Sequence, residues 1–399
     1  MRNVLYLLFM TAAYAMASGL LLGAAPQASL QFGASSQDLG IMGACSPIGY
    51  AGSCLLFGWI FQNYAGKWIV AIGIVLGIFA AAQLFLAESV AAVGLWMFVF
   101  GISSGAFWPF TSAWMFDFTT PNLTKTKILR LYNVGWTSGT AIGVFAGGYI
   151  TRAYDPQLTF KVGAFALLAS FILSMIPPPT HHSLAPSNAT ATFSRRRVGV
   201  ALLIAAVIAN LSALAMRSTV VVNYAELNSF LGHQADRMGI FVACTMAGQM
   251  LAFIFGSLYE PLLGLRRVYA ATAVSIVLVS MAFAFSDNLI VLIAASLLIG
   301  LLSAVAFQCN IIAATECFAT QRLGTTFHEA MVGLGGLAPI PAGFLADALK
   351  PHTAEGTALQ SPFFALAGLA LLGLFLQMWL ISRRANERVL LPAAAVPQH

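Results

Sequence analysis

The sequence is dominated by apolar stretches about twenty residues long, separated by short polar segments. A membrane-spanning α-helix needs roughly 20 mostly apolar residues, because the hydrocarbon core of a bilayer is about 30 Å thick. Twelve stretches meet this requirement: residues 4–30, 38–61, 68–87, 90–116, 130–151, 159–177, 198–225, 237–258, 267–285, 288–315, 325–347 and 360–382. The sequence therefore predicts an all-α integral membrane protein with twelve transmembrane helices.

The composition supports this prediction and excludes several other classes. Charged residues make up 8% of the chain and hydrophobic residues 59%, whereas soluble domains carry about 25% charged residues. The small basic surplus lies between apolar stretches, so it does not indicate a nucleic-acid partner. The five cysteines are an odd number without a Cys-x-x-Cys pair, so neither a disulfide framework nor a zinc site is indicated. We expect no metal and no cofactor.

The distribution of basic residues predicts the topology. With a cytoplasmic N-terminus, 14 of the 19 Lys and Arg residues fall at cytoplasmic ends and only four in outer loops, while Arg217 lies inside a segment. The four outer residues are Arg152, Lys161, Arg237 and Lys350. Because cytoplasmic loops are enriched in Lys and Arg, we expect both termini to be cytoplasmic.

Two phrases 199 positions apart indicate an internal repeat. Residues 40–49 read GIMGACSPIG and residues 239–248 read GIFVACTMAG, with five identities in register. Further matches align residues 101–117 with 300–316 and residues 139–148 with 335–344. Six helices per copy give the two copies the same orientation, as in parallel transporter repeats.

The repeat defines the expected domain organisation. The N-terminal six-helix half covers residues 1–177, and the C-terminal half covers residues 198–383. Between them, residues 178–197 form a Pro/Ser/Thr-rich cytoplasmic linker that ends in three arginines. Residues 384–399 form a cytoplasmic tail.

The loops after the second and eighth helices carry the pattern of a known family. Their matching residues are Gly58, Gln62, Gly66 and Lys67, then Gly256, Glu260, Gly264, Arg266 and Arg267. This pattern and the two parallel six-helix halves resemble the major facilitator superfamily, whose loop reads Gly-x-x-x-Asp-Arg-x-Gly-Arg-Arg. The resemblance covers nearly the whole chain and implies a secondary transporter. It also implies a charge latch between the halves, formed by Asp117, Glu316, Glu260, Arg266 and Arg267.

The glycines of the fifth helix have two interpretations. Gly139, Gly143, Gly147 and Gly148 resemble the family's antiporter motif, with Val144 where that motif has proline. Glycine at every fourth position also makes a flat face for close helix packing, and we favour packing alone. Phe98 stands where proton-coupled drug exporters of the family carry an arginine, which counts against that subfamily.

Arg217 is the only basic residue well inside a predicted helix. Ionisable groups at membrane depth usually mark a pathway or a binding site, and a guanidinium binds a carboxylate or phosphate bidentately. The alternative is an arginine whose charge reaches the outer headgroups. We favour binding. Organophosphate exchangers of the same family carry a similar arginine, but they pair it with a second one where this chain has Gly19, so a monovalent or zwitterionic substrate is expected.

His328 and Glu329 enter the eleventh helix about one turn from the cytoplasmic side. A buried glutamate can carry a coupling proton, or the two residues can form a cytoplasmic gate. Both interpretations stay open. Neutral candidates for the substrate site also lie near mid-depth, where amides and aromatic rings supply the few polar contacts of an apolar cavity. They are Tyr14, Tyr50, Trp108, Asn133, Trp136, Asn210, Gln249, Gln308 and Asn310.

These observations favour a secondary active transporter that moves a small organic solute, most simply an organic anion, by alternating access. The alternatives are an efflux antiporter for hydrophobic drug-like compounds and a non-transporting membrane sensor on the same fold. An enzyme is not expected, because HEAMV at 328–332 lacks the second histidine of a zinc protease motif. We expect a monomer in a bacterial inner membrane, with H⁺ or a counter-anion as the coupling partner.

Overall fold

The computed structural model describes residues 2–60, 66–117, 125–176, 200–259, 262–263, 265–318 and 321–382, and within these ranges the chain forms fourteen α-helices and no strand. In the N-terminal half they are α1 (Arg2–Gln31), α2 (Ser36–Ile60), α3 (Gly66–Phe85), α4 (Val90–Asp117), α5 (Lys125–Ala153) and α6 (Pro156–Met175). In the C-terminal half they are α7 (Val200–Phe230), α8 (Asp236–Ile254), α9 (Gly256–Tyr259), α10 (Arg266–Phe285), α11 (Leu289–Cys317), α12 (Gln321–Gly335), α13 (Pro339–Leu349) and α14 (Glu355–Ser382).

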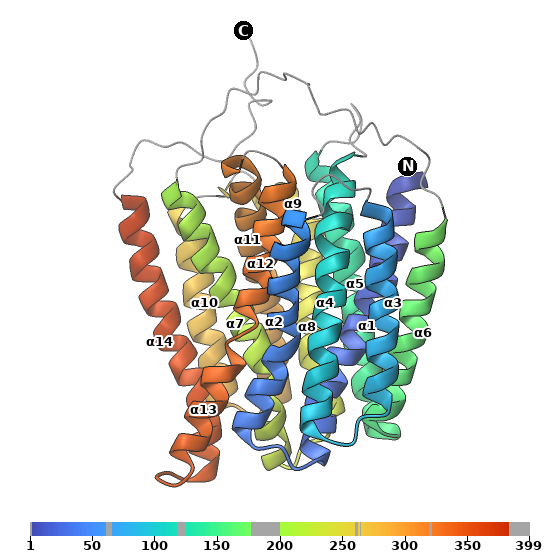
Figure 1. The fold of residues 1–399 in the computed structure, drawn as a ribbon. Helices are drawn as coiled ribbons and strands as arrows, with labels where there is room; N and C mark the ends of the chain where they lie inside the picture. The colour runs from blue at the N-terminus through green and yellow to red at the C-terminus, as the bar shows by residue number, and fades with distance from the viewer. Residues whose placement is uncertain are drawn as a thin grey trace.

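Some predicted features fall outside this part of the chain. The linker 178–197, the tail 384–399 and Glu260 lie outside the described residues, and so does the side chain of Asp117. The helices run roughly parallel to one axis (Figure 1). We call the end of the bundle where α1 begins and α14 ends the proximal end, and the opposite end, where α1 ends and α2 begins, the distal end.

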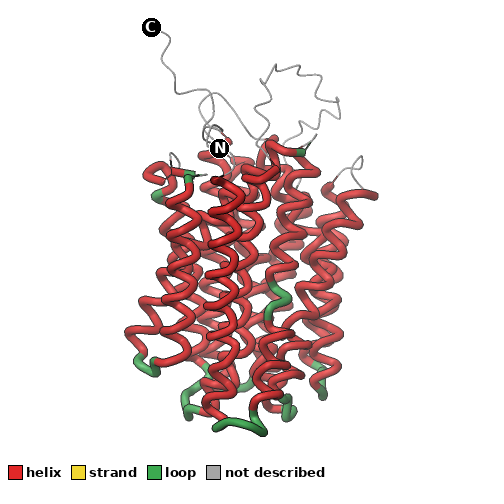
Figure 2. The backbone as a smooth tube through the Cα atoms, turned by 90° about the vertical axis from the view of Figure 1, so that its left-hand side faces the viewer, coloured by secondary structure: helices red, strands yellow, loops and turns green. Residues whose placement is uncertain are grey.

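Two of the twelve expected segments are broken, which is why they appear as fourteen helices. The eighth continues from α8 into the single turn α9, and the eleventh is divided into α12 and α13. The second break follows from Pro339 and Pro341, which have no N–H to donate. Here the backbone changes to i→i+3 hydrogen bonds, from Gly336 N–H to the Gly333 carbonyl (3.0 Å) and from Leu337 N–H to the Leu334 carbonyl (3.1 Å). Figure 2 shows this break in green, half-way along the bundle.

The all-helical membrane fold predicted from the sequence is confirmed. Eleven of the expected segments are long and apolar enough to cross a membrane by length and composition. The remaining one, α5, has 29 residues but carries basic residues at both ends and many Gly, Ser and Thr residues between them. Because α5 packs against α1 in its own half and against α8 in the other, much of its surface faces protein rather than lipid. This position explains its lower hydropathy.

Each half is built around its own buried apolar cluster. One cluster draws almost entirely on α1–α6, and the other only on helices of the C-terminal half. The two halves meet mainly where α5 packs on α8 and where α2 packs on α12 and α13. The candidate site lies along these two contacts.

The glycines of α5 allow close helix contacts, as the packing interpretation predicts. A Cβ atom on Gly139 or Gly143 would lie 2.1 Å from the carbonyl oxygen of Ala12 or Met16 on α1. No side chain fits at that distance. Gly148 of α5 faces Gly239 of α8 across the two halves, where an added Cβ would lie 3.1 Å from the opposite Cα. Small residues therefore set the spacing both within the N-terminal half and between the halves.

Candidate transport site

A row of aromatic rings crosses the contact between the halves. Trp108 of α4 and Trp136 of α5 lie 6.4 Å apart between ring centroids. Trp136 lies 5.9 Å from Phe307 of α11 and 6.3 Å from Phe253 of α8. The structure thus brings both predicted tryptophans to the contact between the halves, and Trp136 into contact with rings of the C-terminal half.

Polar side chains lie on the face of α11 that also carries Phe307. Ser303, Phe307 and Asn310 are spaced i, i+4 and i+7, so they lie on one side of the helix. Gln249 of α8 donates its Nε2 hydrogen to the Ser303 hydroxyl at 2.8 Å. Asn310 Nδ2 lies 3.0 Å from His328 Nδ1, and the Phe307 ring packs edge-on against the His328 ring at 4.3 Å. Three of the predicted site residues are therefore held together by α8, α11 and α12.

Glu329 of α12 is bound by the N-terminal half. The Tyr50 hydroxyl of α2 donates to one carboxylate oxygen at 2.5 Å, and the Ser112 hydroxyl of α4 donates to the other at 3.2 Å. Ser112 also bonds the Tyr132 hydroxyl of α5 at 3.0 Å. These groups are buried, so a carboxyl group of one half is connected to three helices of the other.

Arg217 lies half-buried in the middle of α7. Within the described part of the chain it forms no hydrogen bond and no ion pair. Its neighbour Ser218 donates to the carbonyl of Gly335 at the end of α12 (3.4 Å), which places this part of α7 beside the α12–α13 break. An unpaired guanidinium at this depth is costly unless water or an anion accompanies it.

Tyr14 and Gln308 have different surroundings. The Tyr14 ring stacks on Phe107 at 3.8 Å, and its hydroxyl bonds Ser103 and Ser104 at 2.8 and 3.1 Å. Tyr14 is fully buried and supports Trp108 edge-on at 5.6 Å, so its polar group is already satisfied within the N-terminal half. Gln308 is also buried, and its Nε2 has no hydrogen-bond partner.

The residues of the predicted cytoplasmic charge latch do not meet across the halves in the described part. Glu316 is exposed at the end of α11, and Arg266 and Arg267 are exposed at the start of α10. Arg266 donates to the Ile381 carbonyl of α14 in its own half (3.3 Å). Glu260 and the Asp117 side chain lie outside the described residues, so the latch stays a prediction.

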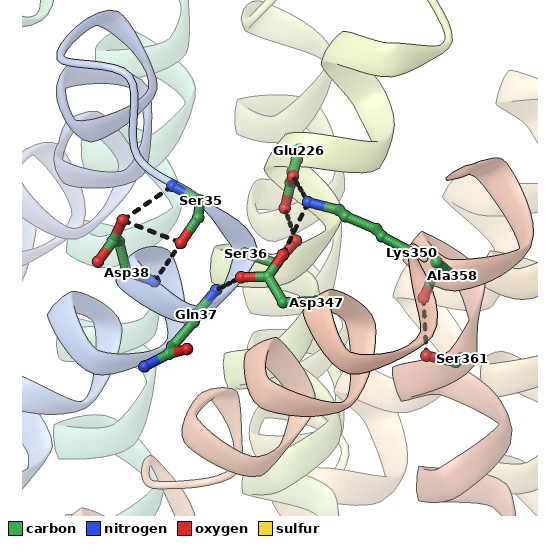
Figure 3. Close-up of polar contacts among 9 residues, drawn as sticks. All are labelled: Ser35, Ser36, Gln37, Asp38, Glu226, Asp347, Lys350, Ala358 and Ser361. Carbon is green, nitrogen blue, oxygen red and sulfur yellow. Dashed lines mark hydrogen bonds and ion pairs between the residues drawn. The ribbon is translucent and has the colours of Figure 1, made fainter. Parts of the chain in front are cut away.

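Sequence reasoning missed a charged cluster at the distal end, which we call the distal latch: Ser36, Gln37, Glu226, Asp347 and Lys350 (Figure 3). Lys350, just beyond α13, forms ion pairs of 2.8 Å with both Glu226 of α7 and Asp347 of α13. From the other half, Ser36 donates to Glu226, and the Gln37 N–H donates to Asp347 at 2.7 Å. The latch therefore joins the first turn of α2 to the C-terminal half.

The electrostatics of the distal latch favour a charged lysine. Burial alone would lower the pKa of Lys350, but the hydrogen bonds and negative charges of Asp347 and Glu226 outweigh it and raise the pKa. A second ion pair joins the halves at the same end, where Arg152 of α5 lies 2.6 Å from Asp236 of α8. The distal end is therefore closed by contacts along both the α2–α13 and the α5–α8 lines.

Two parallel six-helix halves, with polar and aromatic groups buried between them, define the class of membrane transporters that work by moving two halves against each other. The sequence over residues 7–258 matches the model of the Major Facilitator Superfamily. The chain therefore belongs to the major facilitator superfamily. It is an integral membrane transporter and not an enzyme.

Solved structures share the fold. The nucleoside transporter NupG is 12% identical, with a TM-score of 0.73 over 96% of this chain and 99% of that chain. A bacterial homologue of the human lysosomal transporter Spinster, in an inward-facing and occupied conformation, is 13% identical, with a TM-score of 0.70 over 98% of both chains. No curated protein matches the sequence significantly. At these identities the likeness shows the fold alone.

Proposed function

We propose that this chain is a secondary active transporter for a small organic anion, with Arg217 as the counter-charge of the substrate. The observation that carries the proposal is the unpaired state of Arg217, which lies half-buried in mid-membrane without an acidic partner among the described residues. A carboxylate or phosphate ester would supply the missing partner through two parallel hydrogen bonds.

The fold supports a single cation at this depth. The repeat-equivalent position in α1 is Gly19, where a Cβ atom would lie 2.6 Å from the Thr140 carbonyl oxygen and 2.9 Å from the Val144 nitrogen. No second arginine fits there without separating α1 from α5. One positive charge suits a monovalent or zwitterionic solute better than a divalent one.

Glu329 is the proposed coupling group, with H⁺ as the coupling ion. Its carboxylate accepts hydrogen bonds from Tyr50 and Ser112 of the other half. A proton bound to the carboxylate would occupy one of these acceptor sites, so protonation would weaken a contact between the halves. Proton binding would in this way favour the rocking motion of alternating access. A counter-anion is the alternative coupling partner.

The drug-efflux alternative depends on a different observation. Trp108, Trp136, Phe253 and Phe307 offer an aromatic surface between the halves, and a neutral apolar compound would pack there without Arg217. The anion proposal is preferred because it also gives the unpaired charge a function. The charge asymmetry of the loops supports cytoplasmic termini, and we propose a monomer in a bacterial inner membrane.

Arg217→Gln tests the proposal. Purified protein in liposomes is assayed for uptake of radiolabelled monocarboxylates and phosphate monoesters. We expect uptake to fall at least 30-fold, because the substrate would lose a buried charged partner. Lys161→Gln, which removes an exposed basic residue of α6, is the matched control and leaves uptake within twofold. Unaltered anion uptake by Arg217→Gln, or Arg217-independent transport of neutral apolar compounds alone, overturns the anion proposal.

A further inference from the structure

Four buried side chains beside the aromatic row each keep one polar atom without a partner. They belong to α5, α8, α11 and α12, and each residue is at most 1% exposed. The atoms are Asn133 Nδ2, Gln249 Oε1, Asn310 Oδ1 and His328 Nε2. Buried polar atoms are nearly always hydrogen-bonded, so such a group indicates a role for a ligand or for ordered water.

Asn133, Gln249 and Asn310 each lie close in sequence to one of the rings of Trp136, Phe253 and Phe307. The Asn133 Oδ1 accepts a hydrogen bond from Trp136 Nε1 at 2.9 Å, which leaves its Nδ2 group unused. Gln249 precedes Phe253 by four residues and Asn310 follows Phe307 by three, so each amide shares a helix face with a ring. Unused donors and acceptors therefore lie next to aromatic rings contributed by both halves.

The pair of Asn310 and His328 always presents one donor and one acceptor when the imidazole is neutral. If Asn310 Nδ2 donates to His328 Nδ1, the amide oxygen stays free to accept and the Nε2 hydrogen stays free to donate. If the amide is turned over, Nδ1 donates to its oxygen, and the free amide hydrogens and Nε2 exchange roles. The complementarity of this edge therefore holds for both orientations of the amide.

No charged side chain is among the four. Glu329, the residue after His328, is bound on both carboxylate oxygens by the N-terminal half. Arg217 belongs near the end of α12, because its neighbour Ser218 bonds Gly335. Gly335 is seven residues beyond His328, or about 10 Å along a helix. The four unpaired polar atoms and the Arg217 guanidinium therefore lie at different depths along the contact between the halves.

We propose that this cluster is a recognition site for a planar, uncharged heterocycle that carries both donors and acceptors on its edge. The rings of Trp136, Phe253 and Phe307 pack on the faces of the heterocycle, and the four unpaired atoms bond its edge. The proposal deepens the proposed function and, in naming the whole substrate, rests on it. That substrate is a heteroaromatic compound whose anionic substituent reaches Arg217.

The test measures binding of three probes to the purified full-length protein by titration calorimetry. Orotate carries both a polar ring edge and a carboxylate, benzoate carries the carboxylate alone, and uracil carries the ring edge alone. We expect orotate to bind at least tenfold more tightly than benzoate. Asn310→Ala and, in the other half, Asn133→Ala each weaken orotate and uracil at least tenfold and benzoate less than twofold.

Tyr224→Phe is the matched control. The Tyr224 hydroxyl is also buried and unpaired, but it lies among Phe241, Phe283 and Phe363 in the core of the C-terminal half. This variant leaves all three affinities unchanged. Thermal unfolding of each variant confirms that it is folded, and the two asparagine variants act independently, so one unfolded variant does not remove the test.

The outcomes separate this inference from the proposed function. Equal affinity for orotate and benzoate, or equal weakening of both by the asparagine variants, shows that water satisfies the four atoms and overturns the heterocycle site. An Arg217→Gln variant that binds orotate and benzoate as the wild type does overturns the anion function instead. Uracil binding that depends on Asn310 and Asn133 would then still support the heterocycle site.

Discussion

The two halves share one architecture but differ in how they satisfy their buried polar groups. In the N-terminal half, Tyr14 is bonded by two serines, and Tyr132 is bonded by Thr111 and Ser112. In the described part of the C-terminal half, many buried polar atoms have no partner, including Asn210 Nδ2 and both amide atoms of Asn223 on α7. In the described part of the N-terminal half only Ser29 Oγ and Asn133 Nδ2 lack a partner, so the same fold is nearly saturated on one side and unsaturated on the other.

This difference indicates which half of the protein recognises the substrate. A saturated half has few free hydrogen-bonding groups to offer a ligand, whereas unpaired buried groups are stabilised only when a partner arrives. The repeat-equivalent residues follow the same division, since Gly19 stands against Arg217. We infer that the C-terminal half supplies most of the groups that recognise the substrate and that the N-terminal half mainly supports them.

The largest expected effect comes from Glu329→Gln, which tests whether the connection between the halves carries a proton. The amide keeps an acceptor for Tyr50 but does not titrate. We expect uptake driven by a pH gradient to fall at least 100-fold, because the coupling proton has no binding site. Exchange of solute without a gradient stays within threefold, since substrate contacts are intact. Both activities are measured in liposomes.

An equal loss of driven uptake and exchange in Glu329→Gln would contradict the coupling role. Glu329 would then act as a gate residue whose charge holds the halves together. Glu88→Gln, which alters an exposed acid between α3 and α4, away from the connection, shows how much a change of net charge alone contributes.

An intermediate effect is expected from Lys350→Met, which leaves Glu226 and Asp347 without their cation. The side chain of Lys350 is 27% exposed, so solvent screens the pairs and their contribution is about 1 kcal/mol. We expect the population open at the distal end to rise about fivefold. A cysteine at Val221, which lines a small cavity near this end, is labelled with an impermeant maleimide in a background without the native cysteines. Unchanged labelling rates would show that the latch does not hold the distal end closed.

The smallest effects come from a matched pair of tyrosine variants, one in each half. Tyr14→Phe removes the partner of Ser103 and Ser104 and is expected to cost about 1–2 kcal/mol of unfolding free energy. Tyr224→Phe removes a hydroxyl that has no partner, so its effect is near zero or slightly stabilising. Thermal unfolding in detergent measures both. Equal shifts in the two variants would remove the contrast between the halves.

Much of the fold could be predicted from local pattern. Segment length and hydropathy located the spans, and glycine spacing indicated that α5 packs closely against another helix. The hydropathy of α5 is less diagnostic because a helix that packs against α1 on one side and α8 on the other has less surface in contact with lipid. These features depend on residues near one another in the sequence, which is why one sequence suffices to find them.

The candidate site was less predictable because its pairs join distant segments. Arg217 could be singled out as a lone basic residue, but its lack of a partner could not. Lys350 was assigned to an outer loop, but its partner Glu226 lies 124 positions away in the sequence. Their pairing depends on how the ends of α7 and α13 pack in three dimensions. A sequence names such groups but does not reveal which of them meet.

The interruption between α12 and α13 has a mechanical consequence. Glu329 lies on α12, while Asp347 and Lys350 lie at the far end of α13, so one segment carries both the proposed proton site and part of the distal latch. Because two prolines remove backbone hydrogen bonds at the junction, bending there costs less than bending an intact helix. The junction therefore acts as a hinge. Bending at this hinge lets α13 move away from α2 while α12 stays in contact with Tyr50 and Ser112.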